Sequence, residues 1–202
     1  MIIGVTGSSG AGKSTVCEFL ENNYKVKIIN ADKISKKLSK KGTSYVIEII
    51  EKFGKDIVNE EGELKRKKLA EIIYNNPEKR ELLNKCTFKY IIKEIKAQIK
   101  KVKDTETTII IDAPLLFESG LNRICDKIIG VISNRDLQIE RIVARDNIDY
   151  EDAEKRLNAQ QSNKYYIQRC DKIIENNNNL KNVFTELEKV CKEYKVVLTN
   201  TN

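Results

Sequence analysis

Apolar residues along this chain occur in two patterns, short continuous runs and longer stretches with helical spacing. The continuous runs lie at 2–5, 26–29, 108–112, 127–133 and 172–175, and each predicts a β-strand. Because apolar residues in most of these runs are consecutive rather than alternating with polar ones, the runs are typical of a parallel sheet that is covered on both faces. The pattern therefore predicts the α/β class, with a five-stranded parallel sheet and helices on both of its faces. At 202 residues the chain is expected to form one domain.

Stretches with helical spacing fill the intervals between these strands. A helix is expected at about 13–22, and residues 33–104 are expected to form a helical lobe that is helical over 33–75 with a break at Glu61-Gly62. Asn76-Pro77 supplies an N-cap and a first-turn proline for a long helix that follows. Two polar helices, at about 136–145 and 150–161, are separated by a hinge at 146–149 and are expected to form a small lid over 136–161. A closing helix is expected to bury the apolar residues Leu180, Val183, Phe184, Leu187, Val190, Cys191 and Tyr194.

Composition removes several kinds of chemistry. The chain has no histidine, which excludes histidine general bases, catalytic triads that contain histidine and histidine-ligated metal sites. Its five cysteines are widely spaced and never form a C-x-x-C pair, so we expect reduced thiols that pack as small core residues in a cytosolic protein. The N-terminus lacks a basic leader, and no apolar run approaches the roughly 18 residues that a membrane span needs. We therefore expect a cytoplasmic protein that does not enter membranes.

The net charge of +7 is unevenly distributed. Residues 33–104 contain 20 Lys and Arg against 11 Asp and Glu, a balance of +9, whereas the rest of the chain contains 17 against 19, a balance of −2. This local excess predicts an anionic partner for the lobe, either a nucleic acid or a small ligand with several phosphates. The alternative is that runs such as Lys65-Arg66-Lys67-Lys68 are solvated helix faces. Nucleic acid is the weaker candidate, because Trp is absent and no basic-aromatic signature of an RNA-binding sheet occurs.

A phosphate-binding motif follows the first predicted strand. Gly7-Ser8-Ser9-Gly10-Ala11-Gly12-Lys13-Ser14 matches G-x-x-x-x-G-K-[ST] and opens the first predicted helix. Glycines let the backbone turn its N–H groups toward a phosphate, and the helix N-terminus adds partial positive charge at the same point. Lys13 is expected to reach the β and γ phosphates of a nucleoside triphosphate, the Ser14 hydroxyl to bind Mg²⁺, and Thr15 to lie beside the α phosphate. A glycine-rich connection without a ligand is the alternative.

Two aspartates follow apolar strands near this motif. Asp32 comes after the second strand, and because the carboxyl ends of neighbouring strands face the same crevice in an open α/β sheet, we expect it to look toward the phosphate loop. There it would take the proton of an acceptor hydroxyl held in line with the γ phosphate. The alternative role for Asp32 is an N-cap of the helix that starts near Lys33. Asp112 ends the third strand as a Walker-B acid does when it holds the Mg²⁺ shell, although Asp112-Ala113-Pro114 also fits a turn.

Polar residues of the predicted lid repeat at helical spacing. Gln138, Arg141 and Arg145 are spaced i, i+3 and i+7, so they are expected to point along one face. Arg156 and Gln160, spaced i and i+4, are expected to line the second lid helix. Arginines that swing over the γ phosphate would stabilise transferring charge and exclude the water that would otherwise hydrolyse the nucleotide. A solvated helix surface is the alternative.

Taken together, these motifs resemble the dephospho-CoA kinase family nearly from end to end. The phosphate loop is shared by many nucleotide-binding proteins, whereas the order of the later motifs is far more specific. The resemblance implies a P-loop kinase fold with a CoA-binding helical lobe, and a reaction in which ATP and dephospho-CoA give ADP and CoA, the last step of coenzyme A biosynthesis. The landmarks are Ile3-Gly4-Val5-Thr6-Gly7, Ala31-Asp32, Phe53-Gly54, Gly62, Leu64, Arg66, Leu69, Asn76-Pro77, Pro114-Leu115-Leu116-Phe117-Glu118, Gln138-x-x-Arg141-x-x-x-Arg145-Asp146, Arg156-x-x-x-Gln160 and Asp171-x-Ile173-Ile174-x-Asn176.

Residue roles follow from the resemblance position by position. Residues 10–15 would bind ATP with Mg²⁺, Asp32 would act on the ribose 3′-hydroxyl of dephospho-CoA, and Arg141 and Arg145 would contact phosphates from the lid. Arg66 and nearby lysines would bind the pyrophosphate of the acceptor. The remaining substrate contacts implied are Leu115, Glu118, Arg156 and Gln160.

Two departures from the family pattern bear on how the acceptor is placed. The Asp-Ala-Asp that is common in the family is Asn30-Ala31-Asp32 here, so the task of the first acid is either missing or performed by an amide. The usual His-Pro of the long helix is Thr87-Phe88, which removes a histidine that would face the acceptor. Placement of the acceptor therefore depends on residues that differ from the family pattern.

Two other functions remain open on the sequence alone. One is another small-molecule kinase of the same fold, such as a nucleoside or nucleotide kinase. The other is a nucleotide-switched regulatory or nucleic-acid-binding protein, which is disfavoured because no N-K-x-D guanine-reading motif and no D-x-x-G switch segment occurs. A small-molecule kinase is expected to act as a monomer or weak homo-oligomer, with no nucleic acid or membrane as partner.

Overall fold

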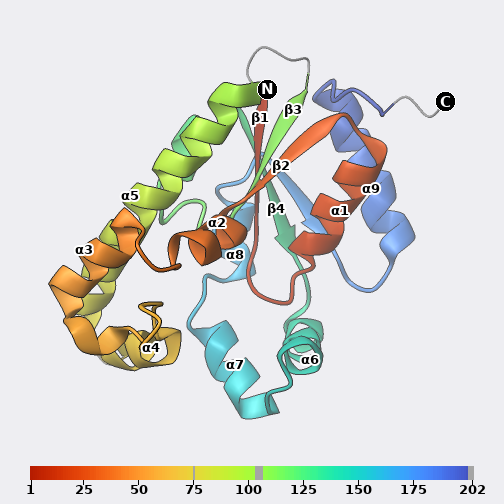
Figure 1. The fold of residues 1–202 in the computed structure, drawn as a ribbon. Coiled ribbons are helices and arrows are strands. Elements are labelled where there is room, and N and C mark those ends of the chain that lie inside the picture. The colour runs from red at the N-terminus through yellow and green to blue at the C-terminus, as the bar shows by residue number, and fades with distance from the viewer. Residues whose placement is uncertain (75, 103–106, 200–202) are drawn as a thin grey trace. The chain divides into compact units, whose positions relative to one another are not determined.

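The computed structural model of the chain describes residues 1–74, 76–102 and 107–199 (Figure 1). It divides into two compact units, one formed by Met1–Ile29 with Val102–Asn202 and the other by Asn30–Lys101. The second unit covers most of the stretch in which we expected a helical lobe, and positions 103 and 104 of that stretch lie outside the described residues. The first unit contains the strands and the phosphate loop.

A five-stranded sheet forms the centre of the first unit. Its order is β2-β3-β1-β4-β5, in which β1 pairs in parallel with β3 and β4, and β4 pairs in parallel with β5. The predicted α/β class and all five strands are confirmed, and every residue of β3 is buried, as a continuous apolar run requires. The strands are β1 (Ile2–Thr6), β2 (Val26–Asn30), β3 (Thr108–Asp112), β4 (Lys127–Ile132) and β5 (Lys172–Glu175).

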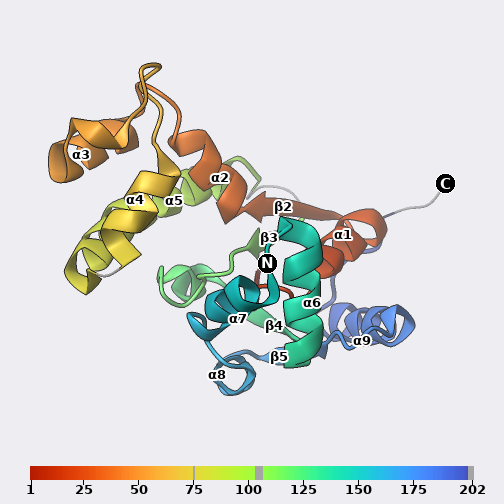
Figure 2. The ribbon, with the colours of Figure 1, turned by 90° about the horizontal axis from the view of Figure 1, so that it is seen from below.

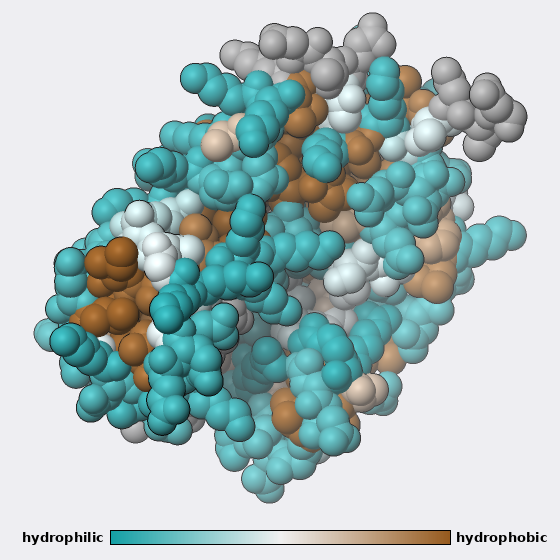
Figure 3. Space-filling model, in the orientation of Figure 1, coloured by the Kyte–Doolittle hydropathy of each residue, from teal (hydrophilic) through white to brown (hydrophobic). Residues whose placement is uncertain are grey.

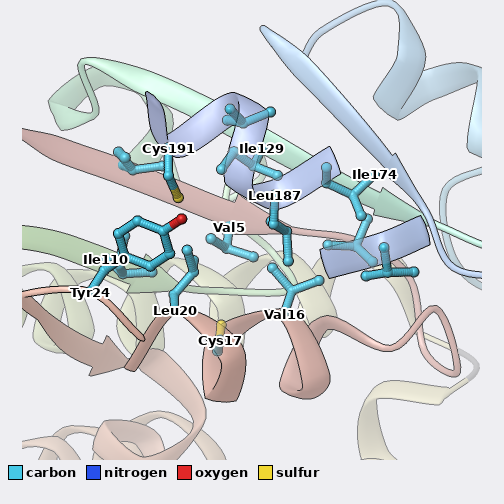
Figure 4. Packing of buried hydrophobic residues seen from close by; sticks show 14 of the residues in the cluster. Val5, Val16, Cys17, Leu20, Tyr24, Ile110, Ile129, Ile174, Leu187 and Cys191 are labelled. Carbon is cyan, nitrogen blue, oxygen red and sulfur yellow. The ribbon is translucent and has the colours of Figure 1, made fainter. Parts of the chain in front are cut away.

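Two helices pack on one face of this sheet. α1 (Lys13–Asn23) and α9 (Leu180–Glu193) share one apolar cluster with the strands, and Figure 4 shows Leu20 and Leu187 reaching toward Val5. Full burial of such a side chain contributes about 1.5–3 kcal/mol, so this cluster anchors the helix that follows the phosphate loop. One core prediction was wrong: Leu180 is 47% exposed, because it is the first residue of α9 and precedes the buried face that starts at Val183.

The opposite face is covered by the segment after β3, which includes a short 3₁₀ helix at Leu121–Ile124, and by α8 (Asn163–Ile167). This segment approaches so closely that a Cβ on Gly4 would lie 2.8 Å from Leu116 Cδ2. We did not predict α8, whose five residues are too few to show helical spacing in the sequence.

All five cysteines are free thiols, as expected. Three of them, Cys17, Cys86 and Cys191, are buried, whereas Cys125 and Cys170 are half-buried. Burial raises the pKa of the Cys17 thiol to about 12, so this side chain packs as a small neutral group. The expectation that the cysteines are core residues therefore holds fully for three of the five.

The second unit is helical, but its first part is more divided than we predicted. We predicted one helical stretch over 33–75 with a break at Glu61-Gly62. The structure instead ends a helix at Phe53, where Gly54 has φ +90°, and Val58 and Leu64 form an isolated antiparallel bridge. Asn76 caps the long last helix as predicted, because its Oδ1 accepts from Lys79 N at 2.9 Å. The helices are α2 (Ala31–Leu38), α3 (Ser44–Phe53), a 3₁₀ turn at Lys55–Ile57, α4 (Arg66–Tyr74) and α5 (Pro77–Val102).

Two helices connect β4 to α8, and they pack side by side (Figure 2). α6 (Arg135–Asp146) and α7 (Tyr150–Asn158) confirm the two predicted polar helices, with Asn147 at φ +52° in the hinge and Asp149 capping α7. The second helix is shorter than expected, because the C-cap residue Ala159 ends it. Gln160 therefore lies beyond α7 rather than on its surface, which corrects the predicted i and i+4 pair with Arg156.

Hydrophilic residues make up most of the face visible in Figure 3, as expected for a sequence with 33% charged residues. Within the described residues, we find no helix with the length and apolar character needed to cross a bilayer.

Candidate active site

The carboxyl ends of four strands meet at one edge of the sheet. Register pairs Val5 of β1 with Asp112 of β3, and Ile132 of β4 with Glu175 of β5. The chain passes from β3 on one side of β1 to β4 on the other, which makes this edge a topological switch point of the kind where α/β sheets bind ligands. The phosphate loop leaves β1 at this edge.

The loop has the backbone conformation that its glycines predict. Gly10 and Gly12 both have positive φ, and a Cβ on Gly10 would lie 2.4 Å from Gln138 O. α1 then begins at Lys13, and no side chain of the described residues caps it at Gly12. The first-turn N–H groups of a helix are donors without an intrahelical partner, so this end of α1 suits a phosphate.

Lys13 forms an ion pair with Asp112. Its Nζ donates to Asp112 Oδ1, and both side chains are largely buried, at 13% and 5% exposed. The pair joins the end of the phosphate loop to the end of β3 and holds the ammonium group at the edge where phosphates would bind. Ser14, the next residue, is exposed, and Thr15 is half-buried.

The three predicted residues of α6 all contact the phosphate loop. Gln138 is buried, and its Nε2 donates to Ser8 Oγ at 2.6 Å and to Ser9 O at 3.1 Å. Arg141 Nη1 donates to Gly10 O at 3.0 Å, and Arg145 Nη2 donates to Ser9 Oγ at 3.0 Å. The spacing i, i+3, i+7 therefore places one face of α6 on the loop. The alternative of a solvated helix surface is wrong for the buried Gln138, whereas Arg145 contacts the loop with a side chain that is 55% exposed.

Ser9 is the residue of the loop that the lid region contacts most. Its N–H donates to Gln160 Oε1 at 2.7 Å, in addition to the bonds of its carbonyl and hydroxyl with α6. Asp146, at the end of α6, binds the guanidinium groups of both Arg145 and Arg156. Hydrogen bonds from Arg145 are the main cause that lowers the pKa of the Asp146 carboxyl, so it is charged at neutral pH.

Asp32 lies in the second unit, in the first turn of α2, and it is exposed. The alternative role that we considered for it, the N-cap of this helix, belongs instead to Asn30, whose Oδ1 accepts from Lys33 N at 2.7 Å. An amide oxygen caps a helix about as well as a carboxylate oxygen, so Asn30 still caps α2 where the family commonly has an acid. Asp32 is thus not needed to cap the helix.

The other departure from the family pattern also has a structural partner. Thr87 Oγ1 donates to Leu83 O at 2.7 Å and lies 3.1 Å from the hydroxyl of Tyr45, which is buried. Thr87 therefore joins α5 to α3 within the second unit.

The remaining predicted substrate contacts lie in different places. Leu115 and Glu118 are exposed on the segment after β3, and Leu116, which lies between them in the sequence, is fully buried. Arg66 begins α4, and its side chain lies outside the described part of the chain.

Sequence reasoning gave no role to two residues that the site contains. Asn176 follows β5 at the same sheet edge, and its Nδ2 donates to Ala11 O at 3.2 Å. Asp146 joins two arginines from different lid helices. The rule that pointed to Asp32 and Asp112, a polar residue directly after a buried strand, would also have found Asn176.

A phosphate loop at the switch point of a parallel sheet, contacted by two arginines of the helix that follows β4, is typical of P-loop phosphotransferases. The family model described as dephospho-CoA kinase matches residues 1–182. The chain belongs to the dephospho-CoA kinase family, whose members are ATP-dependent kinases.

Individual relatives agree with this assignment. The chain is 46% identical over 192 residues to the dephospho-CoA kinase of Fusobacterium nucleatum, covering 95% of this chain and 97% of that protein. It is 31% identical to the dephospho-CoA kinase of Bacillus cereus, covering 98% of each. Its structure is similar to the dephospho-CoA kinase from Campylobacter jejuni, with a TM-score of 0.60, 28% identity and coverage of 95% and 96%. The crystal structure of TT1252 from Thermus thermophilus has the same fold, with a TM-score of 0.79, 23% identity and coverage of 96% and 97%.

Proposed function

We propose that this chain transfers the γ-phosphoryl group of ATP to the ribose 3′-hydroxyl of dephospho-CoA and releases CoA and ADP. The observation that carries the proposal is the phosphate loop, whose Ser8, Ser9 and Gly10 bind four polar side chains from the lid region. Such a loop, covered by polar and cationic groups, suits a triphosphate that must be kept from water. Membership of the dephospho-CoA kinase family supports the choice of acceptor.

In this proposal residues 7–15 bind the triphosphate through backbone N–H groups and the hydroxyls of Ser14 and Thr15. The Lys13 ammonium group reaches the β and γ phosphates, either by breaking its ion pair with Asp112 or while keeping it. There its positive charge offsets the negative charge that develops on the leaving ADP. Arg141 and Arg145 add positive charge from the lid, and Arg156 supports Arg145 through Asp146.

A magnesium ion fits the oxygen groups at this edge. The Ser14 hydroxyl and the Asp112 carboxylate are hard oxygen ligands, which Mg²⁺ prefers. Among the described residues there is no group of three or more His, Cys, Asp or Glu that would hold a metal alone, so phosphates and water would complete the coordination. When bound, the ion neutralises charge on the phosphates.

Asp32 is the proposed general base. It accepts the proton of the 3′-hydroxyl while the bond from this oxygen to the γ phosphorus forms and the bond from the γ phosphorus to the β,γ-bridging oxygen breaks. The basic second unit, including Arg66, would bind the acceptor's pyrophosphate, and Leu115, Glu118 and Gln160 would contact the substrates. We also infer a cytoplasmic enzyme that acts as a monomer or weak homo-oligomer.

The direct test is an acceptor panel. The protein is incubated with Mg²⁺ and ATP plus dephospho-CoA, adenosine or common nucleotides, and products are identified by mass spectrometry. We expect ADP release in stoichiometry with CoA and only with dephospho-CoA. Phosphorylation of a nucleoside or nucleotide instead would replace this proposal with another kinase activity.

Asp32→Asn tests the base. We expect transfer to fall by several orders of magnitude, because the amide cannot accept the proton, while ATP affinity stays within about twofold of the wild type. Asp56→Asn is a matched control, since Asp56 is an exposed acid of the same unit whose carboxylate pairs with Lys68 at 3.8 Å. Unchanged turnover in Asp32→Asn would remove this residue from the mechanism.

A further inference from the structure

Asn176 is a buried polar residue at the carboxyl end of β5, and the mechanism above does not use it. It is 2% exposed, and its backbone N–H, its backbone carbonyl and its side-chain amide all form hydrogen bonds. Its backbone N–H donates to Ile132 O at 2.8 Å, and its backbone carbonyl accepts from Ser133 Oγ at 2.7 Å. Its Nδ2 donates to Ala11 O at 3.2 Å, so the side chain is directed at the phosphate loop.

The Asn176 amide also lies against the glycine that precedes Lys13. A Cβ on Gly12 would lie 1.9 Å from Asn176 Nδ2. Gly12 has φ +92°, a conformation that side chains rarely adopt, so this turn is fixed both by glycine and by the amide packed on it. The backbone at Ala11 and Gly12 cannot change shape without displacing Asn176.

Arg141 connects this contact to the lid helix α6. Its Nη1 donates to Gly10 O at 3.0 Å, and its Nη2 donates to Asn176 O at 3.0 Å and to Asn178 Oδ1 at 2.8 Å. These acceptors are neutral oxygens. The N–H groups of the guanidinium therefore hold the loop in place, and its positive charge next to the loop is not neutralised by them. The loop, the end of β5 and α6 thus form one hydrogen-bonded network.

We propose that Asn176 is a positioning residue for the nucleotide: it fixes the Ala11–Gly12 turn so that the loop N–H groups and Lys13 face the β and γ phosphates. The inference rests on the proposed function only in that the loop binds ATP. It does not depend on which acceptor is phosphorylated. A residue with a purely structural role would instead change stability without changing the affinity for those phosphates.

The test compares Asn176→Ala with Asn179→Ala, an asparagine of the same loop. Asn179 caps α9 by accepting from Asn182 N at 3.1 Å, so its loss destabilises the fold without removing the bond to Ala11. Affinities for ATP and for AMP are measured by calorimetry, together with the thermal midpoint of each variant. We expect Asn176→Ala to weaken ATP binding about tenfold, which corresponds to about 1.4 kcal/mol, while AMP affinity stays within about twofold. We expect Asn179→Ala to lower the midpoint with both affinities unchanged.

Asn176→Asp gives a second measurement if the alanine variant does not fold. It keeps the shape and the acceptor for Arg141, but its carboxylate cannot donate to Ala11 O and adds negative charge near the phosphates, so we expect at least the same loss of ATP affinity. ATP affinity within about twofold of the wild type in either variant would overturn the inference, as would an equal loss for ATP and AMP. Wild-type protein that does not bind ATP would instead contradict the proposed function.

Discussion

The two arginines of α6 that reach the phosphate loop have different surroundings. Arg141 is bonded to neutral oxygens of Gly10, Asn176 and Asn178, whereas Arg145 lies between the Ser9 hydroxyl and the Asp146 carboxylate. The Arg145 side chain is 55% exposed, so its guanidinium is accessible to a bound phosphate. We therefore expect Arg145 to shield the phosphates and Arg141 to shape the loop.

Arg145→Ala is expected to raise the fraction of ATP that is hydrolysed without transfer. Removal of the side chain deletes the bond from Arg145 to Ser9 Oγ and uncovers this part of the loop, so water has easier access to the γ phosphate. The measurement is the ratio of free phosphate to phosphorylated acceptor. Arg135→Ala is the matched control, because Arg135 lies on the same helix but donates to Glu154 and Asn158. An unchanged ratio in Arg145→Ala would exclude this role.

At the level of elements, α3 and α5 are joined by a polar contact around Glu48. Its Oε2 accepts from Lys89 Nζ at 2.9 Å and from the Tyr90 hydroxyl at 2.8 Å. These hydrogen bonds, that from Lys89 first, lower the pKa of the Glu48 carboxyl to about 2. The two helices also contribute Tyr45, Ile49 and Leu83 to one apolar cluster, so the Glu48 contact adds polar bonds to apolar packing between them.

This contact makes the stability of the second unit depend on acid pH. Because the pKa of Glu48 is lower in the folded state, its contribution is fully present above the ordinary value of 4.5 and is lost as pH falls from about 4.5 toward about 2. Thermal midpoints are measured for wild type and Glu48→Gln across this range. We expect the wild type to be the more stable at neutral pH and the difference to shrink in acid. A difference that is constant with pH would contradict the assigned pKa.

At the level of the whole molecule, the two units have separate apolar cores. The core of the first unit lies between the sheet, α1 and α9 (Figure 4), and the core of the second includes Ile49 and Ile57. Within the described residues, side chains of the first unit such as Gln138 and Asn176 bond to the phosphate loop, so we expect the integrity of the loop to depend on that core.

Ile49→Ala and Leu187→Ala form a matched pair that tests this division, since both side chains are 0% exposed. Each change is expected to cost about 2–5 kcal/mol. Hydrogen exchange monitored by mass spectrometry is expected to show lost protection in α3 and α5 for Ile49→Ala, with ATP affinity retained. For Leu187→Ala we expect lost protection in α1 and α9 and weaker ATP binding. Equal loss throughout the chain in both variants would mean that the units unfold together.

Local sequence determined much of this protein. Consecutive apolar residues predicted the five strands, because a parallel strand that is covered on both faces buries neighbouring side chains, as β3 does. The phosphate loop was predictable because its glycines and Lys13 act within eight consecutive residues. Helical spacing also predicted that Gln138, Arg141 and Arg145 share one face, since three to four residues make one turn.

Only the tertiary structure decided which partners these side chains meet. The pairing of Lys13 with Asp112, and of Asn176 with Ala11, joins residues about a hundred or more positions apart, which no local pattern encodes. The capping of α2 by Asn30 rather than Asp32, and the end of α7 before Gln160, depend on where each helix begins and ends. Where a helix begins or ends depends on packing and capping free energies that differ by only a few kcal/mol between neighbouring positions. The residue pattern predicts whether a helix or a strand forms, but not its exact ends.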